Sequence, residues 1–198
     1  DRMPALRTIA HMCGIRTWFR HTAFLAVYLL VCCQPLFAQS PGREYQLKSV
    51  FLLHFTQFVE WPETSFKSDT SPLIIGVLGN NPFGAYLEQA VAGEKVDFHP
   101  VVVRYYKKES EASGCHILFL NAEPDKIAGI LRSLHGKNIL TVSDRPGFAR
   151  QGGMIYLFNK DNKIKIQVNI DACKKSELVL SSKLLRLAEI FEPPKTNN

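Results

Sequence analysis

The segment LKSVFLLHFTQFVEWP, which begins at Leu47, places apolar side chains at the spacing of a helix. Phe51, Phe55 and Phe58 recur at i, i+4 and i+7, so their rings are expected along one helix face. Trp61 is followed by a proline, which disfavours helical backbone in the residue before it, and we expect the helix to end there. The pattern favours a helix packed on a core. The alternative is that part of this aromatic face, with Trp61, contacts a partner protein or a second copy of the chain.

Further along the chain, apolar runs of strand length alternate with segments of helical periodicity. The run CHILFL is continuous, which is typical of a strand covered on both faces, and the turn Lys-Asp-Asn between two later runs predicts an antiparallel hairpin. The alternation predicts an α/β fold class, with a single three-layer domain whose mixed, mostly parallel sheet has about five or six strands flanked by helices. Strands are expected at residues 73–78, 101–106, 115–120, 138–142, 154–159 and 163–169, and further helices at 82–91, 124–134, 171–178 and 182–190.

The beginning of the chain has the features of an export signal. Arg16 and Arg20 precede an apolar run at residues 22–33, and the segment PLFAQS follows, which predicts a secretory signal peptide cut after Ala38. The run is short for a membrane span, which needs about 20 residues, so an uncleaved anchor is the less favoured alternative. A lipoprotein is also disfavoured, because the residue before Cys32 is a valine where lipidation needs a small side chain.

We therefore expect a leader at residues 1–38, one α/β domain at 39–192 and a disordered tail at 193–198. The whole chain has 24 basic and 18 acidic residues. The leader removes four arginines and Asp1, which leaves 20 basic and 17 acidic residues and a net charge of +3. Because this charge is small and forms no basic stripe along the sequence, we expect no binding to nucleic acid.

Cys115 and Cys173 are the cysteines that remain after the leader. An exported compartment permits a disulfide between them, which would close a long loop and stabilise the fold by about 4 kcal/mol in the chain-entropy model. The alternative is two separate buried thiols, since Cys115 begins an apolar run. The sequence leaves both possibilities open.

Two loops that follow expected strands are candidates for binding, because open α/β sheets bind ligands beyond the carboxyl ends of their strands. The first contains Asn80, Asn81 and Phe83 and precedes a helix, whose free N–H groups could hold an anion. It lacks a nucleotide-binding glycine pattern, so a plain strand–helix turn is the favoured interpretation.

The second loop contains Ser143 and Asp144, followed by the glycine pair Gly152 and Gly153. The serine and the aspartate could cap a turn or contact a ligand or partner. The glycines are most simply explained as backbone positions that need a positive φ or close packing. Turn chemistry is favoured here over a ligand-binding loop.

Nothing in the sequence predicts catalysis, a cofactor or a metal site. No pair of the histidines after the leader has metal-ligand spacing to another histidine, cysteine or carboxylate. Cys115 and His116 are adjacent in an expected strand, so their side chains point to opposite faces and cannot form a nucleophile–base pair. We therefore expect a protein that is not an enzyme, with a periplasmic small-molecule receptor as an alternative function.

Several of these segments, taken in order, resemble the YfiR-like family of periplasmic regulators. The first helix resembles the family pattern KAAFLYNFAKFVEWP, and LIIGVLGNNPFG resembles IxVLGxxPFG. CHILFL, LTVSD with FA and GGMI, and NI with SSKLL resemble later family blocks, so the resemblance covers about residues 43–191. Cys173 departs from a family position that is often small or basic.

The resemblance implies a non-catalytic repressor that binds the periplasmic sensor domain of a membrane diguanylate cyclase. Relief of repression, by envelope or redox stress or by capture by an outer-membrane lipoprotein, raises cyclic di-GMP and promotes biofilm formation. The resemblance also implies that the protein can form a homodimer.

Overall fold

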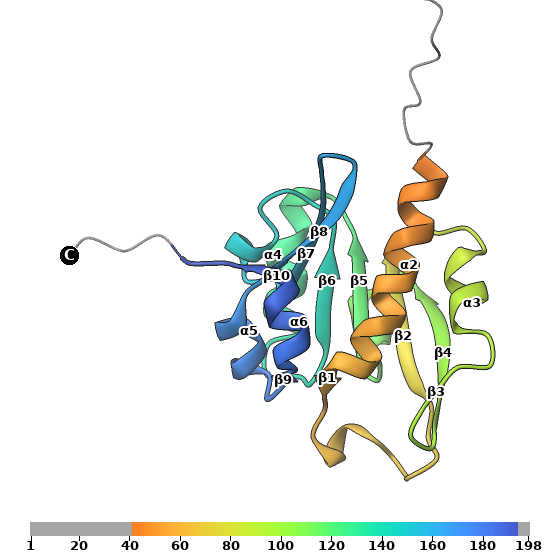
Figure 1. The fold of residues 1–198 in the computed structure, drawn as a ribbon. Coiled ribbons are helices and arrows are strands. Elements are labelled where there is room, and N and C mark those ends of the chain that lie inside the picture. Colours follow the sequence, from red (N-terminus) through yellow and green to blue (C-terminus); the bar gives the residue numbers. More distant parts are fainter. Residues whose placement is uncertain (1–40, 194–198) are drawn as a thin grey trace, which may run out of the picture. The chain divides into compact units, whose positions relative to one another are not determined.

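The structure is a computed structural model that describes residues 41–193 (Figure 1). The predicted leader at residues 1–38 and residues 194–198 of the predicted tail lie outside the described residues.

The centre of the fold is an eight-stranded sheet with the strand order β10-β8-β7-β6-β5-β2-β4-β3 (Figure 1). Neighbouring strands are parallel except at β7–β8 and β3–β4. The predicted mixed, mostly parallel sheet is therefore confirmed, with eight strands in place of five or six. The strands are β2 (Leu73–Gly79), β3 (Lys95–Val96), β4 (His99–Tyr106), β5 (Ile117–Asn121), β6 (Leu140–Ser143), β7 (Ile155–Lys160), β8 (Lys163–Val168) and β10 (Ala188–Ile190).

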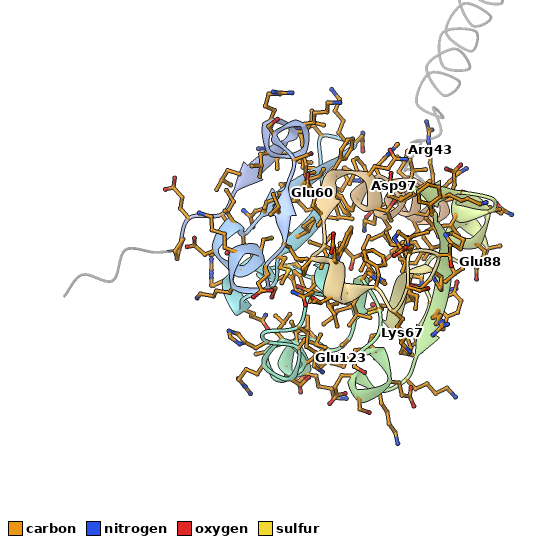
Figure 2. The ribbon with its side chains drawn as sticks, turned by 90° about the horizontal axis from the view of Figure 1, so that it is seen from below. Arg43, Glu60, Lys67, Glu88, Asp97 and Glu123 are labelled. Carbon is orange, nitrogen blue, oxygen red and sulfur yellow. The ribbon has the colours of Figure 1, made fainter. Side chains whose placement is uncertain are left out.

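Helices cover both faces of this sheet because its central strands are apolar on both sides. In β2, Ile75 and Val77 belong to the cluster that includes residues of α2, whereas Ile74 and Leu78 belong to the cluster that includes Ile127 of α4. Figure 2 accordingly shows Arg43, from α2, and Glu123, next to α4, on opposite sides of the sheet. The helices are α2 (Pro41–Phe58), α3 (Tyr86–Val91), α4 (Pro124–Ser133), α5 (Ile170–Lys175) and α6 (Ser182–Leu187), with short 3-10 turns η1 (Glu63–Ser65), η2 (Glu109–Ala112) and η3 (Ala149–Gln151).

The first helix ends earlier than the sequence pattern predicts. α2 stops at Phe58, and the next two residues form β1 (Val59–Glu60), which pairs antiparallel with β9 (Val179–Leu180). The partner strand lies more than a hundred residues away, so this pairing is a tertiary effect. A local signal such as Trp61-Pro62 cannot predict it.

The last helix was predicted too long. The residues Ala188–Ile190 form β10, which pairs parallel to β8, with Ala188 opposite Ile166. Leu187, which helical periodicity places inward, is 70% exposed. Sheet pairing overrides the helical preference of this leucine-rich segment, as tertiary context often does.

Candidate functional site

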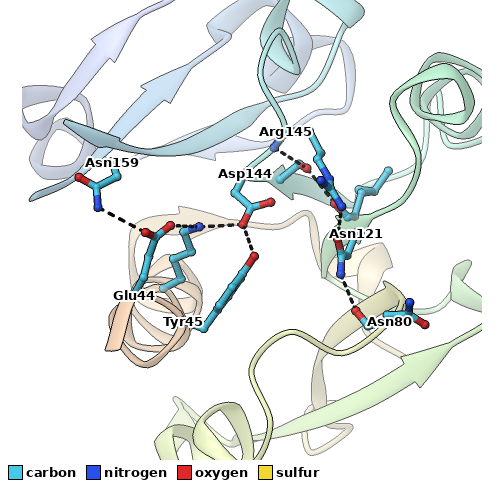
Figure 3. Close-up of polar contacts among 10 residues, drawn as sticks. Glu44, Tyr45, Asn80, Asn121, Asp144, Arg145 and Asn159 are labelled. Atoms are coloured by element: carbon cyan, nitrogen blue, oxygen red, sulfur yellow. Dashed lines mark hydrogen bonds and ion pairs between the residues drawn. The ribbon is translucent and has the colours of Figure 1, made fainter. Parts of the chain in front are cut away.

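A buried group of charged side chains joins α2 to the loop that follows β6 (Figure 3). The Lys48 Nζ lies 2.7 Å from Asp144 Oδ2 and 2.5 Å from Glu44 Oε1, and the lysine side chain is 3% exposed. The Tyr45 hydroxyl donates to Asp144 Oδ2 at 2.9 Å, and Asn159 Nδ2 donates to Glu44 Oε2 at 3.3 Å. We name these five residues the Lys48 cluster. A lysine is rarely buried without partners, so the cluster fixes where α2 lies on the sheet.

Burial and the neighbouring carboxylate also determine the state of the phenol in this cluster. Burial raises the pKa of Tyr45, and the negative charge of Asp144 raises it further. The phenol therefore stays protonated and acts as a hydrogen-bond donor. Since Lys48 Nζ also lies 4.5 Å from the centre of the Tyr45 ring, ring and carboxylate together surround the cation.

A second polar network follows the carboxyl ends of β2, β5 and β6. The buried Ser143 hydroxyl donates to the Leu120 carbonyl at 2.8 Å. Arg145 Nη2 donates to Asn121 Oδ1 at 2.8 Å, and Asn121 Nδ2 donates to the Asn80 carbonyl at 2.7 Å. These bonds tie three strand ends together, so most of their polar groups serve the fold.

The loop after β2 is closed by its own side chains. Asn81 Oδ1 accepts from the Phe83 backbone N–H at 2.8 Å, and Asn81 Nδ2 donates to the Gly84 carbonyl at 3.0 Å. The Phe83 ring is buried and lies edge-on to the rings of Tyr45 and Phe119. Asn81 and Phe83 therefore build the turn and the core.

Glycine is required at positions 152 and 153 for two different structural reasons. Gly152 has φ 97°, in the left-handed region. A Cβ on Gly153 would lie 2.2 Å from the buried Phe148 ring, so Gly153 is required by close packing. Both reasons that the sequence suggested are present, one at each residue.

The seven residues of the predicted crevice thus lie in separate places. Asn80 lines an open cleft of about 530 Å³ with Asn121, Lys107 and Lys126. Asp144 belongs to the Lys48 cluster, and Gly152 lines a different cavity, between α4 and α5. Sequence reasoning missed Tyr45 and Lys48 as partners of Asp144. One feature of the sequence could have revealed them. Lys48 lies one helical turn before the apolar residue Leu52, so both lie on the same face of the helix, and this face is buried.

The aromatic face of α2 is divided between core and surface. Leu52 and Phe55 are buried against the sheet. Phe51 and Phe58 lie at the edge of this buried face and are half-buried. Trp61 follows the helix, is also half-buried, and donates from Nε1 to the His116 carbonyl at 3.2 Å. Phe55 is therefore a core residue, whereas Phe51, Phe58 and Trp61 are partly accessible at the surface.

Of the two possibilities that the sequence leaves open for the cysteines, the structure has the separate thiols, because Cys115 and Cys173 are both free and buried. Cys115 belongs to the cluster on the α4 side of the sheet and Cys173 to the cluster on the α2 side, so the sheet separates them. Burial raises the pKa of each thiol to about 12, which keeps both protonated and unreactive. The alternative of two separate buried thiols describes this fold.

A stack of rings holds the loop between β1 and β2. Phe66 lies between His99 and His116, with ring centres at 4.0 and 4.5 Å. His116 Nδ1 accepts from the Ile74 backbone N–H at 3.0 Å, which places the proton of the neutral ring on Nε2. Burial lowers the pKa of His116 to about 4, so the ring is neutral at pH 7.

This stack predicts a loss of stability in acid. The unfolded chain holds the His116 proton below about pH 6.5 and the folded chain only below about pH 4, so the free energy of unfolding falls as pH drops through that window. We expect about 3 kcal/mol from this group between pH 7 and pH 4, measured by urea unfolding. His116→Asn keeps an acceptor for Ile74 and does not titrate. An equal acid loss in this variant would assign the effect to other groups.

Within residues 41–193, no helix is long and apolar enough to cross a membrane. The same part of the chain contains no group of three or more histidine, cysteine or acidic side chains arranged to hold a metal ion.

The strand order and the Lys48 cluster define a small α/β domain whose N-terminal helix is held by ionic contacts at the carboxyl ends of the strands. A profile of the YfiR/HmsC-like family matches residues 45–189, and the protein belongs to this family.

Among solved structures, a conserved domain protein from Vibrio cholerae O1 biovar El Tor is similar, with a TM-score of 0.43 and 11% sequence identity. The similarity covers 60% of this chain and 54% of that chain, so this chain spans about half the length of that protein.

Proposed function

We propose that this protein acts in the periplasm, where it binds the periplasmic sensor domain of a membrane diguanylate cyclase and represses it. Repression lowers cyclic di-GMP and biofilm formation, and an outer-membrane lipoprotein that captures the protein would relieve it. The observation that carries the proposal is family membership over residues 45–189. The export signal expected before residue 39 supports it, because the leader would deliver the protein to the compartment of the sensor domain.

The outward side of α2 is the surface that we assign to the cyclase. Leu47 and Val50 are each 41% exposed, although both are apolar. His54 is exposed and stacks on Phe58, with ring centres 6.1 Å apart, and Phe51 is half-buried beside them. We name these five residues the α2 flank. Their spacing of three, four and seven residues places them along one side of the helix, next to its buried face.

An apolar stripe with partial exposure is what a protein interface needs at its centre. The homodimer implied by the family resemblance could use the same stripe, so the test of this surface includes the oligomeric state.

The function itself is tested by measuring cyclic di-GMP in a strain that lacks the gene. We expect cyclic di-GMP to rise on deletion. Complementation with the whole chain should reverse the rise, whereas a chain without residues 12–38 should not. An unchanged cyclic di-GMP level in the deletion strain would contradict the proposed repression.

Introducing a charge into the α2 flank should abolish repression without unfolding the domain. Val50→Glu places a carboxylate where the partner is proposed to pack, and desolvating that charge should weaken binding at least tenfold. We therefore expect cyclic di-GMP in cells carrying Val50→Glu to rise to the level of the deletion strain. Ser110→Glu is the matched control, because it adds the same charge at an exposed position in η2, on the α4 side of the sheet.

Sedimentation of the purified variants separates the two uses of the flank. Lost repression with an unchanged oligomeric state supports the cyclase contact. Lost repression together with a loss of dimers would make the flank an interface between copies, and full repression by Val50→Glu would exclude the flank as a partner contact.

A further inference from the structure

A cavity of about 290 Å³ lies between α4, η3, α5 and the residues that follow β10. Its wall combines residues from the LTVSD, GGMI and NI segments of the chain, through Thr141, Gly152, Met154 and Asn169. It is separate from the Lys48 cluster and the α2 flank, none of whose residues line it. Its volume is at the lower end of the range for ligand pockets, about 300 to 1,000 Å³, which suits a metabolite smaller than a drug-sized molecule.

One side of this cavity is apolar. Leu134 and Met154 are buried, and Phe191 is half-buried near the end of the described chain. These side chains offer an aromatic or aliphatic group a surface away from water.

Two hydroxyl groups face the cavity from buried positions. Thr141 is 2% exposed, and its Oγ1 accepts from the Met154 backbone N–H at 3.2 Å, which leaves its own O–H free to donate. Ser176 also lines the cavity and is 5% exposed, and its backbone carbonyl accepts from Asn138 Nδ2 at 3.0 Å. A ligand oxygen in the cavity would accept hydrogen bonds from these hydroxyls.

The charged side chains at the rim are mainly basic. Arg150, from η3, and Lys175, from α5, line the cavity with one carboxylate, Asp171. Both ion pairs found within residues 41–193 belong to Lys48, so neither Arg150 nor Lys175 is neutralised by a carboxylate there. His135 also lines the rim. The rim thus has one surplus positive charge at pH 7.

We infer that this cavity binds a small organic monocarboxylate, with its apolar part against Leu134, Met154 and Phe191. The carboxylate accepts hydrogen bonds from the Ser176 and Thr141 hydroxyls and is attracted by Arg150 and Lys175. Such a ligand would join α4, η3 and α5. This binding site is independent of the proposed cyclase contact, so either can fail without the other.

The test is an NMR titration of the exported chain, purified from the periplasm, with benzoate as the probe. Benzoate at about 20 mM should shift the backbone amide signals of Gly152, Ala172 and Ser176, with a dissociation constant on the order of 1 mM. Benzamide has the same ring without the charge, and acetate has the charge without the ring. Each should bind at least fivefold more weakly than benzoate.

Neighbouring lysines on α5 provide the matched variants. Lys175→Gln should weaken benzoate binding about fivefold, because its charge lines the cavity. Lys174→Gln makes the same change one residue away, at a side chain that lines a different groove, and should leave the affinity unchanged. Ser176→Ala should weaken binding with both lysines intact.

Three results would each overturn the inference. The first is the absence of shifts at these amides at about 20 mM benzoate, a concentration that would nearly saturate a site with a dissociation constant of about 1 mM. The second is equal binding of benzamide, and the third is an equal effect of Lys174→Gln and Lys175→Gln.

Discussion

Asp144→Ala is expected to lower the free energy of unfolding by about 3 to 5 kcal/mol. The variant leaves Lys48, whose side chain is 3% exposed, with Glu44 as its remaining ionic partner and removes the acceptor of the Tyr45 hydroxyl. Breaking a buried ion pair is expensive because the lysine has already lost its water on burial and now loses the more deeply buried of its two carboxylate partners. Urea unfolding at pH 7, followed by circular dichroism, measures the loss.

Two comparisons make this prediction specific to the cluster. Asp69→Ala removes an exposed aspartate from a loop and should change stability by less than about 0.5 kcal/mol. Replacing both partners, with Lys48→Met and Asp144→Leu together, should restore most of the stability that Asp144→Ala loses, because no unpaired charge stays buried. A loss below about 1 kcal/mol for Asp144→Ala would show that Glu44 alone satisfies the lysine.

Gly153→Ala should destabilise the fold by about 3 kcal/mol, although it adds a single methyl group. The new Cβ would lie 2.2 to 2.5 Å from three carbons of the Phe148 ring, and this ring has no exposed surface into which it could move. The protein must therefore shift either the ring or the backbone between η3 and β7. Thermal and urea unfolding of the purified variant would measure the cost.

The neighbouring glycine is the control, because its requirement is conformational. Gly152→Ala meets no atom within 4 Å but must hold φ near 97°, and it should cost about 1 kcal/mol. Replacing the ring with a smaller side chain, in Phe148→Leu, should recover part of the stability lost in Gly153→Ala and none of the stability lost in Gly152→Ala. If the two alanine variants were equally destabilised and equally unaffected by Phe148→Leu, the steric explanation would be wrong.

The strands of the sheet centre were predictable because burial on both faces leaves a direct signature in the sequence. The segments at residues 73–78 and 115–120 are continuous apolar runs, and they became the adjacent strands β2 and β5. The short strands β3 and β10 have two and three residues, too few to show an alternation of apolar and polar side chains. They form because they pair with the longer strands β4 and β8.

The candidate site was harder to predict, because its residues meet only through the fold. Asp144 is recognisable as a polar residue at a strand end, but Lys48 lies 96 positions earlier in the chain. The sequence also suggested one crevice for Asn80, Asp144 and Gly152, whereas the fold places them in a cleft, an ion-pair cluster and a cavity.

By itself, the sequence determined the α/β class, the main strands, the aromatic first helix and the family resemblance, because these depend on local periodicity and on the order of motifs. The tertiary structure decided which residues of the helix are buried, that Cys115 and Cys173 are separated by the sheet, and that Lys48 meets Asp144. Each of these depends on the strand order and on how α2 crosses the sheet, and contacts between residues far apart in the chain leave no periodic signal in the sequence.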